Sequence, residues 1–168
     1  MEYLQLFDEN HNAIDEKALR SEKHNLPNGK YYMCSIIFIE NNEGKFLMQK
    51  TSKRKQSCIA TPGGHVTYGD TPLDTIVREC KEEMALVLNN DIKLIDVHKD
   101  DEMFLSIYYI KMEIDIDTLV LQPEEVEYVD WYTQKEIENF INKNEFRLGN
   151  IPAYREILSM KKSETMGE

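Results

Sequence analysis

The segment from Thr71 to about Leu88 constrains the fold most, because it carries the clearest helix signal in a chain otherwise rich in strand-like runs. Thr71 is a suitable N-cap, Pro72 suits the first helical position, and Asp74 lies three residues after the cap. Apolar residues recur at helical spacing and predict one buried stripe, made of Leu73, Ile76, Val77, Cys80 and Met84. Such a helix needs a second apolar surface to pack against.

Strand-like runs on both sides of this helix supply that surface. β-branched and aromatic residues between turn sequences predict strands over residues 4–7, 32–39, 45–49, 58–61, 92–97, 104–112 and 127–132. Helical spacing predicts two further helices over residues 133–144 and 152–161. The length of 168 residues predicts one domain spanning residues 1–168, and the interspersed strands and helices make it a mixed α/β (α+β) domain. Residues 1–30 are interpreted as an N-terminal extension and residues 163–168 as a loose tail.

The composition excludes several classes of protein. Acidic residues outnumber basic ones by 31 to 20, for a formal net charge of -11, which excludes a general basic surface for a nucleic-acid duplex. No apolar run approaches the roughly 18 residues of a membrane span, and the N-terminus lacks the pattern of a secretory signal. The three cysteines are widely spaced and form no Cys-x-x-Cys pair, which argues against a zinc site or a disulfide framework. We therefore expect a cytoplasmic protein.

Three carboxylates are predicted to share one face of the central helix. At about 100° per residue, Glu79, Glu82 and Glu83 fall within an arc of about 100°. Like charges at this spacing cost a few tenths of a kcal/mol, so the face is either solvated or neutralised by a hard cation such as Mg²⁺. The preceding Gly63-Gly64 pair favours the cation, because glycine lets a backbone carbonyl approach an ion or a phosphate closely.

The glycines and carboxylates together match a known pattern. Gly64-x5-Asp70-x7-Arg78-Glu79-Cys80-x-Glu82-Glu83-x-Ala85-Leu86 resembles the Nudix box, G-x5-E-x7-R-E-U-x-E-E-x-G-U, in which U is a bulky aliphatic residue. Three positions depart from it: Asp70 is one methylene shorter than the usual Glu, Cys80 replaces an aliphatic residue, and Ala85 replaces Gly. We expect Ala85 to extend the helix or shift its exit. The resemblance implies a Nudix-like α/β/α sandwich around a mixed β-sheet.

The resemblance also implies an activity. Proteins of this family hydrolyse a diphosphate linkage in a nucleoside diphosphate joined to another moiety, or a related phosphoanhydride. It implies Mg²⁺ as the cofactor, with Mn²⁺ as the alternative, held by the main-chain carbonyl of Gly64 and by Glu79, Glu82 and Glu83. Arg78 would orient Glu79 or Glu82, and Glu83 would also orient the attacking water. The partner is then a small-molecule diphosphate, and the choice between monomer and homodimer stays open.

Residues outside the box are also candidates. Relatives contribute a glutamate from a loop like the one holding Glu124 and Glu125, so either is a candidate general base, with a solvated turn as the alternative. Lys50 and Arg54 belong to a short basic cluster that is suited to phosphate, or else forms a solvated hairpin end. His65 beside the glycines is either a phosphate contact or an exposed loop histidine.

Two other functions rank lower. The N-terminal half is similar to the branch close to isopentenyl-diphosphate isomerase, but Gly63 stands where those isomerases have a catalytic cysteine, and Cys58 lies five residues earlier. A non-catalytic nucleotide-binding domain is the second alternative. It ranks lower because the carboxylates of the box are all present.

Overall fold

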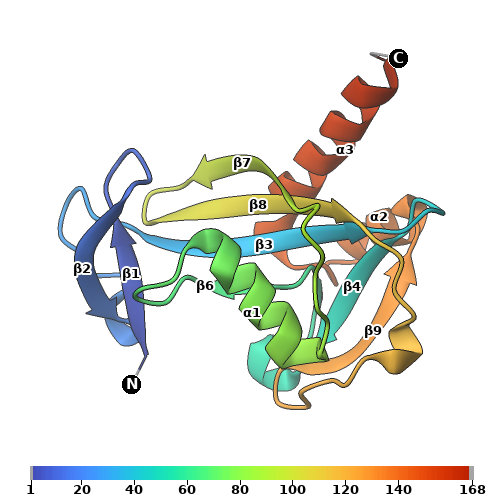
Figure 1. Ribbon diagram of the computed structural model, residues 1–168, viewed down its shortest axis with the longest axis horizontal. Coiled ribbons are helices and arrows are strands. Elements are labelled where there is room, and N and C mark those ends of the chain that lie inside the picture. Colours follow the sequence, from blue (N-terminus) through green and yellow to red (C-terminus); the bar gives the residue numbers. More distant parts are fainter. Residues whose placement is uncertain (1, 167–168) are drawn as a thin grey trace.

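The computed structural model describes residues 2–166, which form two sheets and three α-helices (Figure 1). β1 (Tyr3–Phe7) and β2 (Ala13–Leu19) make a separate two-stranded hairpin. The larger sheet contains β3 (Tyr32–Glu40), β4 (Phe46–Thr51), β5 (Ile59–Ala60), β6 (Gly63–His65), β7 (Lys93–Lys99), β8 (Met103–Lys111) and β9 (Val126–Tyr132). The helices are α1 (Pro72–Met84), α2 (Gln134–Asn142) and α3 (Ile151–Met166).

β3 is the central strand of the larger sheet. It runs parallel to β8 over its whole length, from the pair Tyr32–Met103 to the pair Glu40–Lys111. β8 continues antiparallel to β7, β4 pairs antiparallel with β9, and β6 pairs antiparallel with residues 34–36 of β3. The sheet is therefore mixed, as expected, and β6 holds the glycine segment against the central strand.

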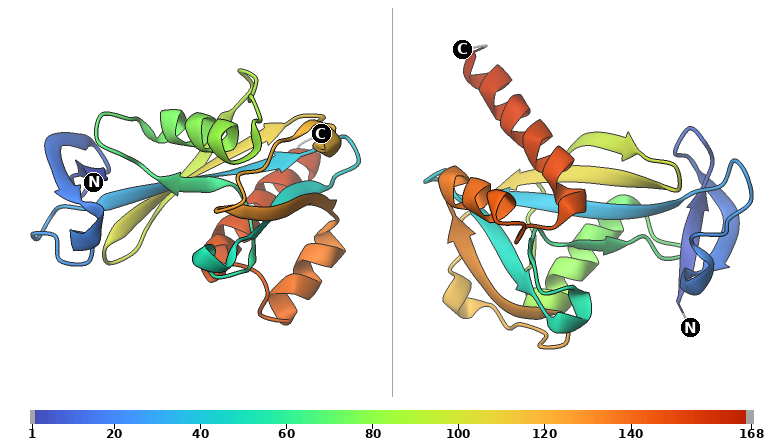
Figure 2. Two further views of the ribbon diagram at one scale, coloured as in Figure 1. Left: turned by 90° about the horizontal axis from the view of Figure 1, so that it is seen from below. Right: turned by 180° about the vertical axis from the view of Figure 1, so that it is seen from behind.

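The helices cover both faces of this sheet (Figure 2). Side chains alternate along β3, so Ile36 and Phe38 pack on the face covered by α2 and α3. Ile37 and Ile39 point to the opposite face and pack with α1. The predicted α/β/α sandwich is confirmed.

The start of α1 is as predicted, but its end is not. The Thr71 hydroxyl accepts from the backbone N–H of Asp74, and the Asp74 carboxylate accepts from the N–H of Thr71. The helix ends at Met84 because Ala85 adopts the left-handed conformation with φ 55°. The predicted extension to Leu88 is therefore wrong, and Ala85 shifts the exit as Gly would.

The apolar stripe of α1 is narrower than its spacing indicates. Ile76, Cys80 and Met84 are buried against the sheet, as predicted. Leu73 and Val77 lie at the edge of the buried face and are 43% and 38% exposed. Helical spacing identifies the apolar face of a helix, but it does not show how much of that face the sheet covers.

Two strands and one helical end were not predicted. β2 is mostly polar and exposed, and β6 contains two glycines, so neither shows the apolar alternation of a buried strand. α3 runs to Met166, so residues 163–166 continue the helix where a loose tail was predicted, and residues 167–168 lie outside the described part. Lysine, glutamate and methionine are good helix formers, which accounts for the longer helix.

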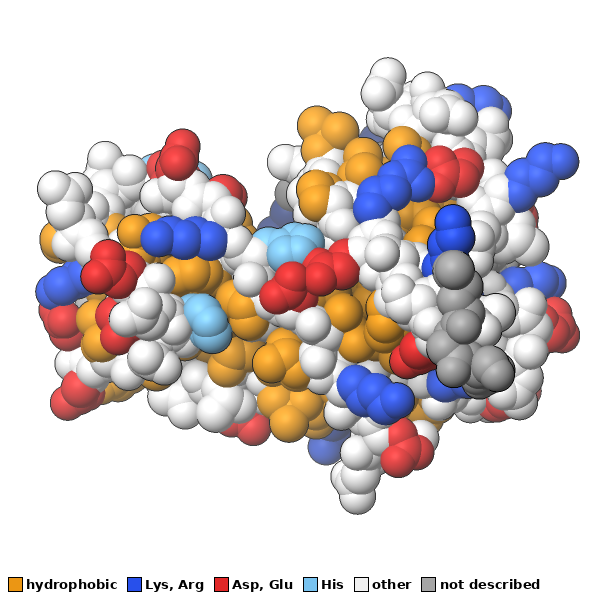
Figure 3. All heavy atoms as spheres, turned by 90° about the horizontal axis from the view of Figure 1, so that it is seen from above, with side chains coloured by type: hydrophobic (Ala, Val, Ile, Leu, Met, Phe, Trp, Pro, Cys, Tyr) orange, Lys and Arg blue, Asp and Glu red, His pale blue; other side chains and the backbone are white. Residues whose placement is uncertain are grey.

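The N-terminal hairpin packs on the larger sheet. Leu4, Leu6 and Phe7 are buried, and bridges join Leu4 to Thr67 and Phe7 to Tyr31. No helix within residues 2–166 has the length and apolar character needed to cross a membrane. On the face shown in Figure 3, acidic and basic side chains are interspersed rather than gathered into one basic surface.

The strain at Ala85 gives the first prediction. A left-handed alanine costs roughly 1–2 kcal/mol relative to the right-handed form, and glycine avoids this cost. Ala85→Gly should therefore raise the free energy of unfolding by about 1 kcal/mol, measured as a higher urea midpoint at unchanged slope. Ala13→Gly, at the exposed start of β2 where φ is negative, is the matched control and should lower the midpoint. Equal effects at both positions would contradict the role of the backbone conformation.

Candidate active site

A cleft of about 700 Å³ lies where α1, β6 and the central strands meet the loops around them. Glu79 and Glu82 of α1 form an acidic wall. Arg54, Lys55 and Arg147 contribute positive charge from the turn after β4 and the segment before α3. The cleft therefore presents both signs of charge although the chain as a whole is strongly acidic.

The two glycines of β6 are required by close contacts. A Cβ at Gly63 would lie 2.3 Å from the carbonyl oxygen of Ser35 in β3. A Cβ at Gly64 would lie 2.7 Å from Cδ of Glu79. The Glu79 carboxyl group therefore packs directly on the Gly64 backbone, in a short strand rather than in a tight turn.

Arg78 joins three carboxylates around the start of the acidic face. Its Nε and Nη2 lie 3.2 and 3.1 Å from Oδ2 of Asp70. Its Nη1 lies 3.1 Å from Oε1 of Glu79 and 3.7 Å from Oε2 of Glu82. The shorter Asp70 thus reaches Arg78, and Arg78 also pairs with Glu79 and Glu82.

Glu83 is the most deeply buried carboxylate of the group, with a side chain 2% exposed. Its Oε2 lies 3.3 Å from Nζ of Lys55, and its Oε1 is buried without a hydrogen-bond partner among the described residues. Burial raises the pKa of Glu83 to about 7, against the opposing charge of Lys55, and the Glu79 carboxylate raises it further. Burial also raises the pKa of Glu79, against the opposing charges of Arg78 and Lys55.

This set of groups fits a hard divalent cation. A buried oxygen without a partner costs about 1–3 kcal/mol, and a cation that it ligates removes that cost. Gly64, Glu79, Glu82 and Glu83 offer only oxygen atoms, the ligands that Mg²⁺ prefers. Glu82 is 55% exposed, so it lies at the solvent side of the group.

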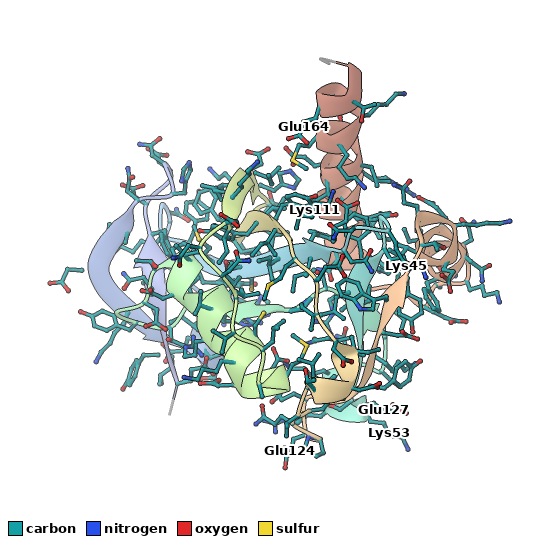
Figure 4. The ribbon with its side chains drawn as sticks, turned by 45° about the vertical axis from the view of Figure 1, so that its right-hand side comes forward. Lys45, Lys53, Lys111, Glu124, Glu127 and Glu164 are labelled. Atoms are coloured by element: carbon teal, nitrogen blue, oxygen red, sulfur yellow. The ribbon has the colours of Figure 1, made fainter. Side chains whose placement is uncertain are left out.

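The two candidate bases, Glu124 and Glu125, both lie on the loop before β9 but in different surroundings. Nζ of Lys55 lies 2.6 Å from Oε2 of Glu125, which lines the cleft. Glu124 is exposed at the outer end of the loop (Figure 4), where its carbonyl accepts from the Ser52 hydroxyl. Of these two glutamates, Glu125 lines the cleft and Glu124 does not.

The end of α1 holds this loop in position. The backbone N–H of Gln122 donates to the carbonyl of Glu83 at 2.9 Å, and the N–H of Val120 donates to the carbonyl of Met84 at 3.0 Å. The carbonyl of Gln122 then accepts from the N–H of Glu125 at 3.0 Å. Glu125 is therefore tied through the backbone to the helix that carries Glu83.

Of the three residues predicted to contact phosphate, two line the cleft and one does not. Arg54 and His65 line the cleft, whereas Lys50 does not. Lys50 shares its face of β4 with Met48, which packs toward α2 and α3. The basic cluster therefore correctly indicates the turn after β4 as part of the cleft, but the side chain of Lys50 in β4 lies on the other face of the strand.

His65 is a half-buried residue rather than an exposed loop histidine. Its ring stacks on Tyr32 with centroids 5.7 Å apart, and its Nε2 lies 3.1 Å from Nζ of Lys23. Burial, together with the positive charges of Arg20 and Lys23, lowers its pKa to about 3. The imidazole is therefore neutral at physiological pH.

Two further groups reach the cleft without a sequence signal, and Lys55 reaches it from the predicted basic cluster. Arg147 donates from Nη2 to the carbonyl of Lys55 at 2.9 Å, and its Nε is buried without a partner among the described residues. Asn150 accepts from the N–H of Thr61 at 3.1 Å. Lys55 belongs to the basic cluster, but nothing in the sequence singles it out. Each is brought here by the fold from a distant segment.

A second group of metal-ligating residue types lies outside the cleft. Asp96 and His98 of β7 meet Glu156 of α3, and their ligand atoms lie within 4.8 Å of one another. Nε2 of His98 is bonded to Glu156 and lies 3.6 Å from Oδ2 of Asp96. These partly exposed groups already pair with one another, so we assign them no metal.

The comparisons agree with the fold. The family model of the NUDIX domain matches residues 32–156, so the chain belongs to the Nudix family. Membership makes it a hydrolase acting on pyrophosphate bonds.

Curated relatives and a solved structure extend over most of the chain. An uncharacterised Nudix hydrolase of Listeria monocytogenes is 25% identical over 173 residues, covering 99% of this chain and 99% of that protein. Another, from Listeria innocua, is 28% identical over 152 residues, covering 87% and 88%. A protein of Deinococcus radiodurans with a solved structure superposes with a TM-score of 0.72 at 18% identity, covering 92% and 98%. That structure supports the fold alone.

The buried carboxylate gives a prediction for the metal-free protein. Because the folded state raises the pKa of Glu83 to about 7, the folded protein binds this proton more tightly than the unfolded chain. The contribution of Glu83 to the free energy of unfolding should therefore fall as pH rises from about 4.5 to about 7. Glu83→Gln should flatten this dependence, measured by urea unfolding in EDTA at pH 5, 6, 7 and 8.

Glu127→Gln, at an exposed position of β9, is the control and should follow the parent at each pH. If Glu83→Gln and the parent protein keep the same difference in unfolding free energy at all four pH values, the assignment of a raised pKa to Glu83 is wrong.

Proposed function

We propose that this chain is a metal-dependent hydrolase of a diphosphate linkage in a nucleoside diphosphate joined to another moiety, or in a related phosphoanhydride. One observation carries the proposal most directly. Glu83 is buried and Glu79 half-buried beside it on α1, and one oxygen of Glu83 has no partner among the described residues. A cleft with basic groups on its other side adjoins them, as a substrate rich in phosphate requires.

The proposed metal ligands are the carbonyl of Gly64 and the carboxylates of Glu79, Glu82 and Glu83. We propose Mg²⁺, with Mn²⁺ as the alternative, because all four groups are hard oxygen donors. When bound, such an ion neutralises phosphate oxygens and lowers the pKa of a coordinated water. We propose that Arg78, although it lines the cleft, positions Glu79 and Glu82 through its guanidinium rather than contacting the substrate.

Glu125 is the loop carboxylate that we propose as the general base. It lines the cleft and is tied to the end of α1, whereas Glu124 faces solvent. Glu83 is proposed to hold and orient the attacking water as well as the metal.

Three cleft residues are proposed to bind the substrate. Arg54 and Arg147 offer guanidinium groups that match the geometry of phosphate oxygens. Neutral His65 has one ring N–H to donate without adding charge. The occupant is proposed to be a small-molecule diphosphate, and the three free cysteines fit a cytoplasmic location.

The two lower-ranked functions are weaker proposals. Cys34 of β3 lines the cleft, but burial raises the pKa of its thiol to about 11, so the thiol stays protonated. Cys58 bonds within the turn after β4, where its sulfur contacts Thr51 at 3.6 Å, and it does not line the cleft. Gly63 has no side chain to replace the isomerase thiol. The non-catalytic alternative has no loss of box carboxylates to support it, because Glu79, Glu82 and Glu83 lie together.

Hydrolysis tests the proposal. Purified protein with Mg²⁺ is screened against nucleotide sugars, dinucleoside polyphosphates, nucleoside triphosphates and coenzymes, with phosphate-containing products resolved by chromatography. Glu83→Gln should lower turnover on the best substrate by more than the roughly 10- to 100-fold typical of residues that only support a metal ligand. Glu82→Gln should also lower turnover strongly, because it removes a proposed ligand.

Glu127→Gln serves as the control because Glu127 lies at the molecular surface (Figure 4). Circular dichroism establishes that each variant is folded. Parent-level hydrolysis by folded Glu82→Gln and Glu83→Gln would falsify the ligand assignment. Conversion of isopentenyl diphosphate to its allylic isomer, without hydrolysis of any substrate, would favour the isomerase instead.

A further inference from the structure

Lys55 lies between a buried carboxylate of α1, Glu83, and a carboxylate that lines the cleft, Glu125. Its Nζ is 3.3 Å from Oε2 of Glu83 and 2.6 Å from Oε2 of Glu125. One carboxylate comes from α1 and the other from the loop before β9, so the ammonium group joins the two sides of the site. The side chains of Glu83 and Glu125 are only 2% and 19% exposed, so these ion pairs are less solvated than pairs at the surface.

The backbone around Lys55 is fixed by groups from two other segments. The carbonyl of Lys55 accepts from the hydroxyl of Thr51 and from Nη2 of Arg147, both at 2.9 Å. The next two residues, Gln56 and Ser57, adopt left-handed conformations with φ 75° and 50°. Such strain persists only where the surroundings impose it, so the turn is held in the shape that aims Lys55 at the carboxylates.

Electrostatic repulsion prevents the Lys55 ammonium group and a divalent cation from both lying beside the Glu83 carboxylate. A buried carboxylate needs a compensating positive charge, and Lys55 supplies it to Glu83. A divalent cation at Glu83 would supply the same compensation, but two cations a few ångströms apart repel each other strongly in a poorly solvated site. Lys55 and a metal ion therefore compete for one carboxylate.

We propose that Lys55 is a built-in counter-ion of Glu83, and that its ammonium group leaves Glu83 when a divalent cation binds. This inference rests on the proposed metal site and deepens it. The long flexible stem of lysine lets Nζ withdraw from Glu83 while it keeps Glu125 as a partner. Lys55 thus lowers the affinity for metal and keeps the buried carboxylates compensated until the metal arrives.

Metal affinity is the first test. Mn²⁺ binding is measured by calorimetry at pH 8 without substrate, for the parent protein and for Lys55→Met. Removing the competing charge should tighten Mn²⁺ binding by about tenfold. Lys53→Met is the matched control, because Lys53 lies in the same turn at the surface (Figure 4) and outside the cleft. Lys55→Arg keeps the charge and should keep the weaker binding.

Chemical labelling of the unmodified chain is the second test, and it does not depend on how a variant folds. Acetic anhydride labelling followed by peptide mass spectrometry should show a rise in Lys55 labelling when Mn²⁺ is added, because the amine loses one of its two partners. Lys53 labelling in the same sample should stay constant.

The outcomes separate two failures. If the parent binds Mn²⁺ but Lys55→Met binds it equally or more weakly, or if saturating Mn²⁺ leaves Lys55 labelling unchanged, the counter-ion role is overturned while the metal site stands. If the parent shows no Mn²⁺ binding at all, the metal site itself is wrong and the counter-ion role falls with it.

Discussion

Burial of the α1 carboxylates is the interaction on which the rest of the site depends. Glu83 is almost completely removed from solvent, and Glu79 lies beside it with a carboxyl group that burial also makes costly to ionise. Two such groups persist only where positive charge surrounds them. Arg78 meets this need beside Glu79 and Lys55 meets it beside Glu83, so two of the basic residues that line the cleft compensate the carboxylates of α1.

The same constraint explains the position of the glycine strand. A carboxylate that packs against backbone needs a residue without a side chain opposite it, and Gly64 provides this space for Glu79. Gly63 meets a related need against Ser35 of the central strand. β6 thus joins the acidic face of α1 to β3, and the sheet fixes the distance between the Gly64 backbone and the helix.

Sequence patterns predicted what is local and missed what depends on distant contacts. The cap of α1, its acidic face and the main strands follow from neighbouring residues, and these are confirmed. β6 shows no apolar alternation, so only its pairing with β3 reveals it as a strand. Arg147 reaches the cleft because the segment before α3 packs against the turn after β4, and no spacing in the sequence indicates that contact.

The exit of α1 shows how one backbone conformation positions the loop before β9. A helix leaves its last carbonyls without intrahelical partners. Ala85 turns the chain away in the left-handed conformation, and the N–H groups of Val120 and Gln122 reach the carbonyls of Met84 and Glu83. Glu83 therefore contributes a buried carboxylate from its side chain, and its backbone carbonyl anchors the loop that carries Glu125. The last turn of α1 thus carries the Glu83 carboxylate and also anchors the loop of Glu125, the proposed base. A shift of this turn would therefore move both carboxylates together, and Lys55, which lies on a different segment, would lose both partners.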